Sequence, residues 1–109
     1  MILTKIRDAI NKLDISWQKH SLQRMFERDI TRQEVKTAIL YGIIIEDYTD
    51  DYPFPSVLIA YINDEKSLHV VVSYDDDSSK CYIITAYVPD RKYFKDDLIT
   101  RREDEETKR

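Results

Sequence analysis

Residues 31–48, which read TRQEVKTAILYGIIIEDY, decide the fold because a helical pattern ends and a strand pattern begins within them. Thr31 and Glu34 have the spacing of a capping box, in which each side chain satisfies a free backbone N–H at the start of a helix. Three apolar residues at helical spacing would be buried: Val35, Ala38 and Ile39. Gly42, the one glycine of the chain, is predicted to end the helix as a left-handed cap.

Before this stretch, the spacing of apolar residues predicts two more helices. Residues 2–13 carry apolar side chains at three- and four-residue steps, which is typical of an amphipathic helix. Residues 20–29 predict a second helix. Its apolar face would carry three residues: Leu22, Met25 and Phe26. The alternation at residues 15–17 indicates a short strand between the two helices.

After Gly42 the chain turns to β-branched and aromatic residues, which predict four strands. These strands span residues 43–48, 57–62, 68–74 and 80–88. The first two are separated by a break that contains Pro53 and Pro55, which cannot donate to a β-ladder. The later links are short and polar, so neighbouring strands should pair as hairpins. The predicted fold class is therefore α+β, with N-terminal helices packed on a four-stranded antiparallel sheet.

Length and composition indicate one globular domain. The 109 residues are 42% hydrophobic and 35% charged, proportions typical of a folded protein. Residues 1–102 are expected to form a single domain with residues 1–13 as a helical extension, and the charged residues 103–109 are expected to be a disordered tail. No apolar run reaches the ~18 residues of a membrane helix, and the first residues lack the apolar core of a signal peptide. The cytoplasm is therefore the expected location.

The net charge of −4 is unevenly distributed. Residues 1–40 carry a net charge of +3, residues 41–90 carry −8, and residues 91–109 carry +1. A polyanion would be attracted to the first and last blocks and repelled by the middle one. The middle block would instead attract a basic partner.

The second predicted helix carries a candidate phosphate site. His20, Arg24 and Arg28 are four residues apart and share one helix face. Two guanidinium groups can bind a phosphodiester, and an imidazole can transfer a proton near neutral pH. The alternative is a solvated helix face whose arginines pair with Glu27, with Asp29 or with the acidic sheet.

A second candidate cluster lies in the predicted sheet. If Tyr74 pairs with Lys80, His69 lies opposite Thr85, and Tyr87 follows on the same face. An imidazole, a hydroxyl and a phenol would then be neighbours. The alternative is a core histidine that the Thr85 hydroxyl satisfies.

Several other chemistries are disfavoured by composition. A single glycine excludes the glycine-rich phosphate loops of the Walker and dinucleotide types. Cys81 is the one cysteine and is expected to be a core residue rather than a nucleophile. No metal site and no cofactor are predicted, because residues 75–77 resemble a tight turn rather than a calcium loop. A metal-dependent nuclease that uses Glu46, Asp50 and Asp51 is the least favoured alternative.

Taken together, these motifs resemble the domain of unknown function 4258 family of bacteria and archaea. The resemblance covers roughly residues 15–102, and its motifs are His20-x3-Arg24-x3-Arg28-x-Ile30-Thr31, Gly42, Tyr48-x-x-Asp51-x-Pro53-x-Pro55-Ser56, Leu68-His69-Val70-Val71, Ile84-Thr85-x-Tyr87-x-Pro89-Asp90 and Arg101-Arg102. One departure is Tyr93-Phe94, where the family often has a tryptophan.

The resemblance implies a RelE/barnase-like toxin fold and the toxin of a type II toxin–antitoxin pair. It also implies a zinc-ribbon antitoxin similar to MqsA as the partner. A metal-independent ribonuclease, which cleaves RNA by attack of a 2′-hydroxyl on phosphate, is the expected activity. No DNA partner and no membrane partner is expected.

Within this hypothesis, each candidate residue has a role. His20 is the general base or acid, and His69 is its complement or an orienting group. Arg24 and Arg28 bind phosphate. Residues expected to position phosphate or RNA are Ser56, Thr85, Tyr87 and Arg101. The alternative function is a non-catalytic module that docks a basic partner protein through its acidic sheet.

Overall fold

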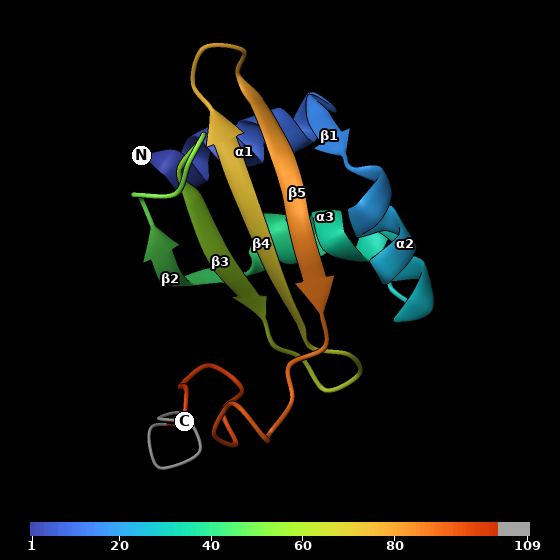
Figure 1. The fold of residues 1–109 in the computed structure, drawn as a ribbon. Coiled ribbons are helices and arrows are strands. Elements are labelled where there is room, and N and C mark those ends of the chain that lie inside the picture. Colours follow the sequence, from blue (N-terminus) through green and yellow to red (C-terminus); the bar gives the residue numbers. More distant parts are fainter. Residues whose placement is uncertain (103–109) are drawn as a thin grey trace.

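Three helices and five strands form the fold in the computed structural model, which describes residues 1–102 (Figure 1). They are α1 (Ile2–Asn11), β1 (Ile15–Trp17), α2 (Lys19–Glu27), α3 (Arg32–Tyr41), β2 (Ile43–Tyr48), β3 (Ser56–Tyr61), β4 (Leu68–Asp75) and β5 (Lys80–Tyr87). The predicted α+β class is confirmed. The predicted tail, residues 103–109, lies outside the described residues.

The sheet has five strands in the order β1-β5-β4-β3-β2, rather than the four predicted. Strands β2 to β5 pair as antiparallel neighbours, as the short links predict. The prediction of a purely antiparallel sheet was wrong, because β1 joins the edge of β5 in parallel and aligns Ile15 with Cys81. The Cys81 N–H donates to the Asp14 carbonyl at 3.0 Å. Three residues are too few to reveal a parallel pairing in the sequence.

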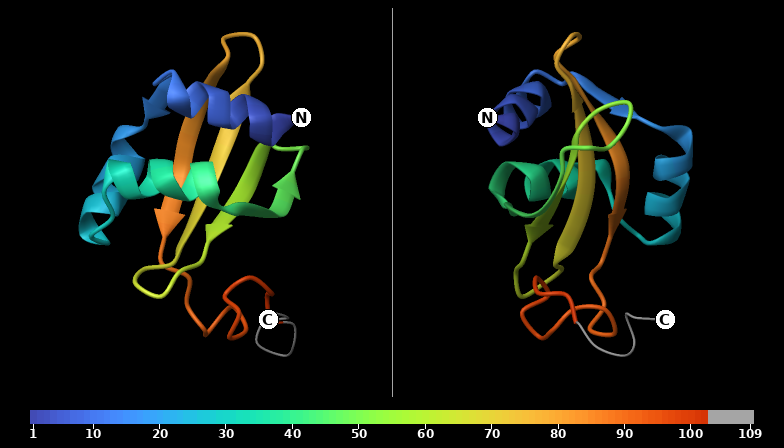
Figure 2. Two further views of the ribbon diagram at one scale, coloured as in Figure 1. Left: turned by 180° about the vertical axis from the view of Figure 1, so that it is seen from behind. Right: turned by 60° about the vertical axis from the view of Figure 1, so that its left-hand side comes forward.

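The helices lie on both sides of the sheet. Figure 2 shows α1 and α3 against one face and α2 on the other side, next to β5. The core between α1, α3 and the sheet contains Ile6, Ile10, Val35, Ile39, Val57, Ile59, Val70, Val72 and Ile83. Helix α1 is thus part of the core.

The end of α3 is held by two contacts that bring distant residues together. The Arg7 side chain on α1 donates to the carbonyls of Ile39 at 2.9 Å and Gly42 at 2.6 Å, which satisfies acceptors at the helix end.

The capping box at the start of α3 is confirmed, since Thr31 and Glu34 exchange both hydrogen bonds.

Gly42 ends α3, but not in the left-handed conformation predicted. Its φ of −84° and ψ of −174° are extended and open to any residue. A Cβ atom built on Gly42 would lie 2.5 Å from the Ala38 carbonyl oxygen and 2.6 Å from that of Ala60. The glycine is therefore required because two backbone segments approach closely where α3 passes into β2.

We predict that Gly42→Ala and Gly42→Asn each lower the free energy of unfolding by about 2–3 kcal/mol, because both add a Cβ against backbone that cannot move aside. Urea denaturation monitored by circular dichroism measures the change. Asparagine readily adopts the left-handed conformation, so a stable Gly42→Asn variant beside an unstable Gly42→Ala variant would contradict the close-approach explanation.

Candidate functional site

The candidate site lies on the face of the sheet that points away from α1 and α3, which we call the open face. Strand register places these side chains on it: Glu46, Tyr48, Ser56, Leu58, His69, Val71, Ser73, Tyr82, Thr85 and Tyr87. Helix α2 flanks this face along β5, and the segment after β5 passes across the end of the sheet (Figures 1 and 2).

A β-bulge sets which residues are neighbours on the open face. Tyr74 aligns with Cys81, not with Lys80 as predicted, and Ile84 is an extra residue in β5. His69 therefore lies opposite Tyr87, and Thr85 lies opposite Val71. The predicted pairing of His69 with Thr85 was wrong for two reasons: Asp75 rather than Tyr74 lies opposite Lys80, and the extra Ile84 shifts the register by one more residue. Thr85 and Tyr87 nevertheless share the open face with His69.

His69 is fully buried, and both of its ring nitrogens have a partner. Nε2 lies 2.7 Å from the carbonyl oxygen of Leu98, and Nδ1 lies 3.3 Å from the Tyr87 hydroxyl. A carbonyl can only accept, so Nε2 carries the proton and Nδ1 accepts from Tyr87. The edge of the Phe94 ring packs against the imidazole at a centroid distance of 4.6 Å.

Burial and the nearby Arg101 lower the pKa of His69, although the contact with Leu98 acts in the opposite direction. The imidazole is therefore neutral at pH 7. Burial also raises the pKa of Tyr87, which keeps the phenol protonated as a donor. Neither ring nitrogen of His69 is free to bind a substrate proton, so the residue is placed to orient Tyr87.

Helix α2 is anchored to the outer edge of β5 through side chains. The Ser21 hydroxyl hydrogen-bonds the carbonyl oxygens of Ile83 at 3.0 Å and Ile84 at 2.7 Å, where the bulge lies. One end of the helix is held by Arg28, which donates to the carbonyl of Ala86 at 2.9 Å and to the Thr85 hydroxyl at 3.3 Å. These bonds supply donors to backbone carbonyls along β5 beyond the short β1 pairing.

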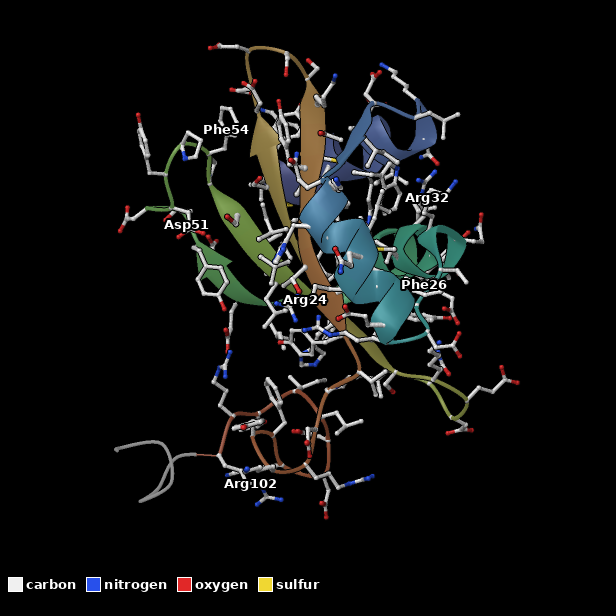
Figure 3. The ribbon with its side chains drawn as sticks, turned by 45° about the vertical axis from the view of Figure 1, so that its right-hand side comes forward. Arg24, Phe26, Arg32, Asp51, Phe54 and Arg102 are labelled. Atoms are coloured by element: carbon white, nitrogen blue, oxygen red, sulfur yellow. The ribbon has the colours of Figure 1, made fainter. Side chains whose placement is uncertain are left out.

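The anchoring fixes how the rest of α2 faces the sheet. Ser21 and Met25 are buried, and Figure 3 shows Arg24 on the side of the helix toward the sheet with Phe26 on the other. Phe26 is 85% exposed, so the predicted apolar face that included it was wrong. His20 precedes Arg24 by one turn and lies on the same side.

We call His20, Arg24 and Arg28 the basic flank. Arg24 lies 3.8 Å from Glu27, so the predicted alternative of a surface ion pair is also present, although such an exposed pair contributes little. His20 and Arg28 are about 12 Å apart along the helix axis. The flank therefore suits successive phosphates of one strand better than a single phosphate.

At the opposite margin of the open face, Arg101 pairs with Glu46. Its guanidinium donates to both carboxylate oxygens, at 2.5 and 3.2 Å, and Tyr48 donates to the same carboxylate. Burial alone would raise the pKa of Glu46, but these bonds outweigh it and the pKa is lowered. The charge of Arg101, which was expected to bind RNA, is thus paired with Glu46 within the protein.

Ser56 lies at the far end of the open face. Its hydroxyl donates to the Asp51 carboxylate at 2.7 Å. Ala60, the residue opposite His69, is four positions further along β3, a distance of about 13 Å. The structure therefore does not bring Ser56 together with the other candidates.

The acidic residues of the middle block are mostly away from the open face. Seven of the ten lie in loops and turns outside the strands: Asp50, Asp51, Asp64, Glu65, Asp76, Asp77 and Asp90. Asp75 lies at the tip of the β4–β5 hairpin. Glu46 projects onto the open face, where Arg101 pairs with it. The sheet is acidic at its ends and at the β2 edge rather than across its face.

Other chemistries find little support within residues 1–102. No group of three or more His, Cys, Asp or Glu side chains gathers there to hold a metal ion. Cys81 is buried, and burial raises the pKa of its thiol to about 11. A pocket of about 430 Å³, whose lining includes Met1, Phe54 and Asp77, lies near the β4–β5 hairpin, at the end of the sheet away from His69.

The site contains residues that sequence reasoning did not identify. Ser21 positions the basic flank, and Phe94 and Leu98 position His69. Glu46 was considered only as a metal ligand. The Phe94 ring is almost fully buried although a turn-rich segment carries it. An aromatic pair at Tyr93-Phe94 beyond the last strand was the one available signal.

Comparison with known proteins gives one match. A family model described as Domain of unknown function (DUF4258) matches residues 17–88. No curated protein and no solved structure matches the chain. None of the helices within residues 1–102 has the length and apolarity needed to cross a membrane.

We predict that His69 makes the fold less stable in acid. Its pKa in the folded chain is below the ordinary 6.5, so the contribution of neutral His69 is complete above that pH and is lost as the pH falls through the lowered value. Urea denaturation between pH 4.5 and 8 should show a smaller loss of stability for His69→Gln than for the wild type. The control is His20→Gln, whose side chain is exposed. Equal acid dependence in the wild type and His69→Gln would contradict the assignment.

Proposed function

The chain belongs to the Domain of unknown function (DUF4258) family, and we propose that it binds RNA along the basic flank and the open face and cleaves it without a metal ion. The proposal includes a RelE/barnase-like fold and the role of toxin in a type II toxin–antitoxin pair. It places the protein in the cytoplasm with a zinc-ribbon antitoxin as its partner.

One observation carries this proposal: the basic flank is mounted beside the hydroxyl groups of the open face. Arg28 hydrogen-bonds both the sheet backbone and Thr85, and Tyr87 follows Thr85 on the same face. Cations and neutral donors that lie together, with Glu46 paired to Arg101, form a surface suited to phosphodiester oxygens. The acidic loops at the ends of the sheet do not oppose this, since screening weakens their effect beyond about 8–10 Å.

The reaction requires two proton transfers and stabilisation of charge on phosphate. His20 takes the proton of a 2′-hydroxyl, whose oxygen then attacks the adjacent phosphorus. The 5′-oxygen leaves with a proton from water, and the product is a 2′,3′-cyclic phosphate. Arg24 stabilises the charge that develops on the phosphate oxygens.

The other residues position the substrate. Arg28 and Thr85 bind the neighbouring phosphate, and Tyr87 is oriented by His69 through the hydrogen bond at Nδ1. His69 is therefore a positioning residue in this proposal rather than the second proton carrier. Arg101 contributes to RNA binding through its remaining donors.

We predict that induced expression of the wild-type chain in bacteria arrests growth and degrades RNA. His20→Ala and Arg24→Ala should each lower the cleavage rate by ~10²–10³, because each removes a group that acts on the reacting phosphate. Lys80→Ala is the matched control, since it removes an exposed cation at the hairpin end of β5. Normal growth with the wild type would refute the toxin role, and equal activity of His20→Ala would refute the role of His20.

We also predict that purified protein cleaves single-stranded RNA equally well in EDTA and in magnesium, because the attacking group is the 2′-hydroxyl. The product should carry a 2′,3′-cyclic phosphate by mass spectrometry. A substrate with 2′-O-methyl groups should resist cleavage while it still binds. Loss of activity in EDTA would contradict the metal-independent mechanism.

A further inference from the structure

The two edges of the sheet differ in whether their backbone hydrogen-bonding groups have partners. On the β5 side, β1 pairs with residues 81–83, and α2 side chains take the carbonyls of Ile84 and Ala86. On the other side, β2 is the last strand, and nothing within residues 1–102 pairs with its outer edge. An open edge exposes a row of backbone donors and acceptors that can pair with another chain.

Strand β2 carries few of the features that protect such edges. Charged lysines, prolines and bulges usually discourage pairing. Residues 43–48 contain no lysine and no proline, and one bulge lies at Ile45, between Ile44 and Glu46. The strand is six residues long, which is enough for a stable ladder with a partner.

An apolar patch lies where β2 begins. Tyr41 is 72% exposed and Ile43 is 54% exposed. They line a pocket of about 220 Å³ together with Ala60, Tyr61 and Ile62. A pocket of this size can receive one large apolar side chain from a strand that pairs with β2.

Beyond the other end of β2 the surface is acidic. No lysine or arginine occurs between Lys36 and Lys66. Glu46 is paired with Arg101, but Asp47 and Asp50 form no ion pair within the described part of the chain. The acidic charge at this end is therefore available to a basic partner.

We propose that the outer edge of β2 binds an extended segment of a partner protein as an added sixth strand. An apolar residue of that segment fills the pocket at Tyr41 and Ile43, and its basic residues lie beside Asp47 and Asp50. A second copy of this chain is disfavoured, because edge-to-edge pairing would bring two acidic strands together.

This inference is independent of the ribonuclease proposal. The β2 edge and α2 lie at opposite margins of the sheet, so a strand could be added while RNA occupies the basic flank (Figure 1). Failure of RNA cleavage would leave the inference standing, and failure of strand addition would leave the cleavage proposal standing.

The test uses the full chain labelled with ¹⁵N and a synthetic peptide that alternates valine and lysine and has one terminal leucine. We expect the peptide to shift the amide resonances of residues 43–48 and to slow their exchange with solvent. A peptide of the same composition with N-methyl groups on alternate residues should not bind, because it cannot complete the ladder. No shift at millimolar peptide, or equal binding of the methylated peptide, would overturn the proposal.

Charge is tested by Asp47→Lys, which should weaken binding of the lysine peptide about 5–30-fold. Asp64→Lys is the matched control, because it makes the same charge change at an exposed turn beyond the other end of β3. Urea denaturation of both variants shows that they remain folded. Equal affinity of Asp47→Lys and the wild type would overturn the proposal. A dimer that forms as the protein concentration is raised and dissociates on dilution would also overturn the proposal, since it would assign the edge to a second copy.

Discussion

The extra residue at Ile84 in β5 is the constraint on which the candidate site depends. It shifts the register with β4 by one residue, so that Tyr87 rather than Ala86 lies opposite His69. At the same point it leaves carbonyl groups that the Ser21 hydroxyl bonds, which docks α2 against the sheet. Because buried carbonyls must be paired, the bulge and the helix require each other. The position of the basic flank follows from this contact.

The segment after β5 completes the open face from the other end. Leu98 accepts from His69, Phe94 packs on the imidazole, and Arg101 pairs with Glu46. These contacts join residues that are between 25 and 55 positions apart in the chain. They hold His69 buried and neutral beside Tyr87, whereas the imidazole of His20 is exposed. The two histidines, which look equivalent as candidates, are thus given different roles by burial.

Charge is distributed differently over the two surfaces for which binding is proposed. The face beside α2 presents arginines and hydroxyl groups, whereas the β2 edge and the sheet ends carry the acidic residues. Treated as one block, residues 41–90 suggested a sheet that repels RNA. In the structure, seven of the ten acids of that block lie in loops and turns rather than in the strands. The two proposed binding surfaces are therefore separate and differ in charge.

The sequence by itself determined the α+β class, the capping box at Thr31 and Glu34, and the antiparallel order of β2 to β5, because these depend on neighbours in the chain. Only the tertiary structure decided the parallel addition of β1, the bulge at Ile84 and the burial of His69. It also showed that Gly42 is needed for a close approach to Ala38 and Ala60 rather than for a left-handed turn. Each of these depends on contacts between distant segments, and local spacing carries no information about which backbone will lie beside another.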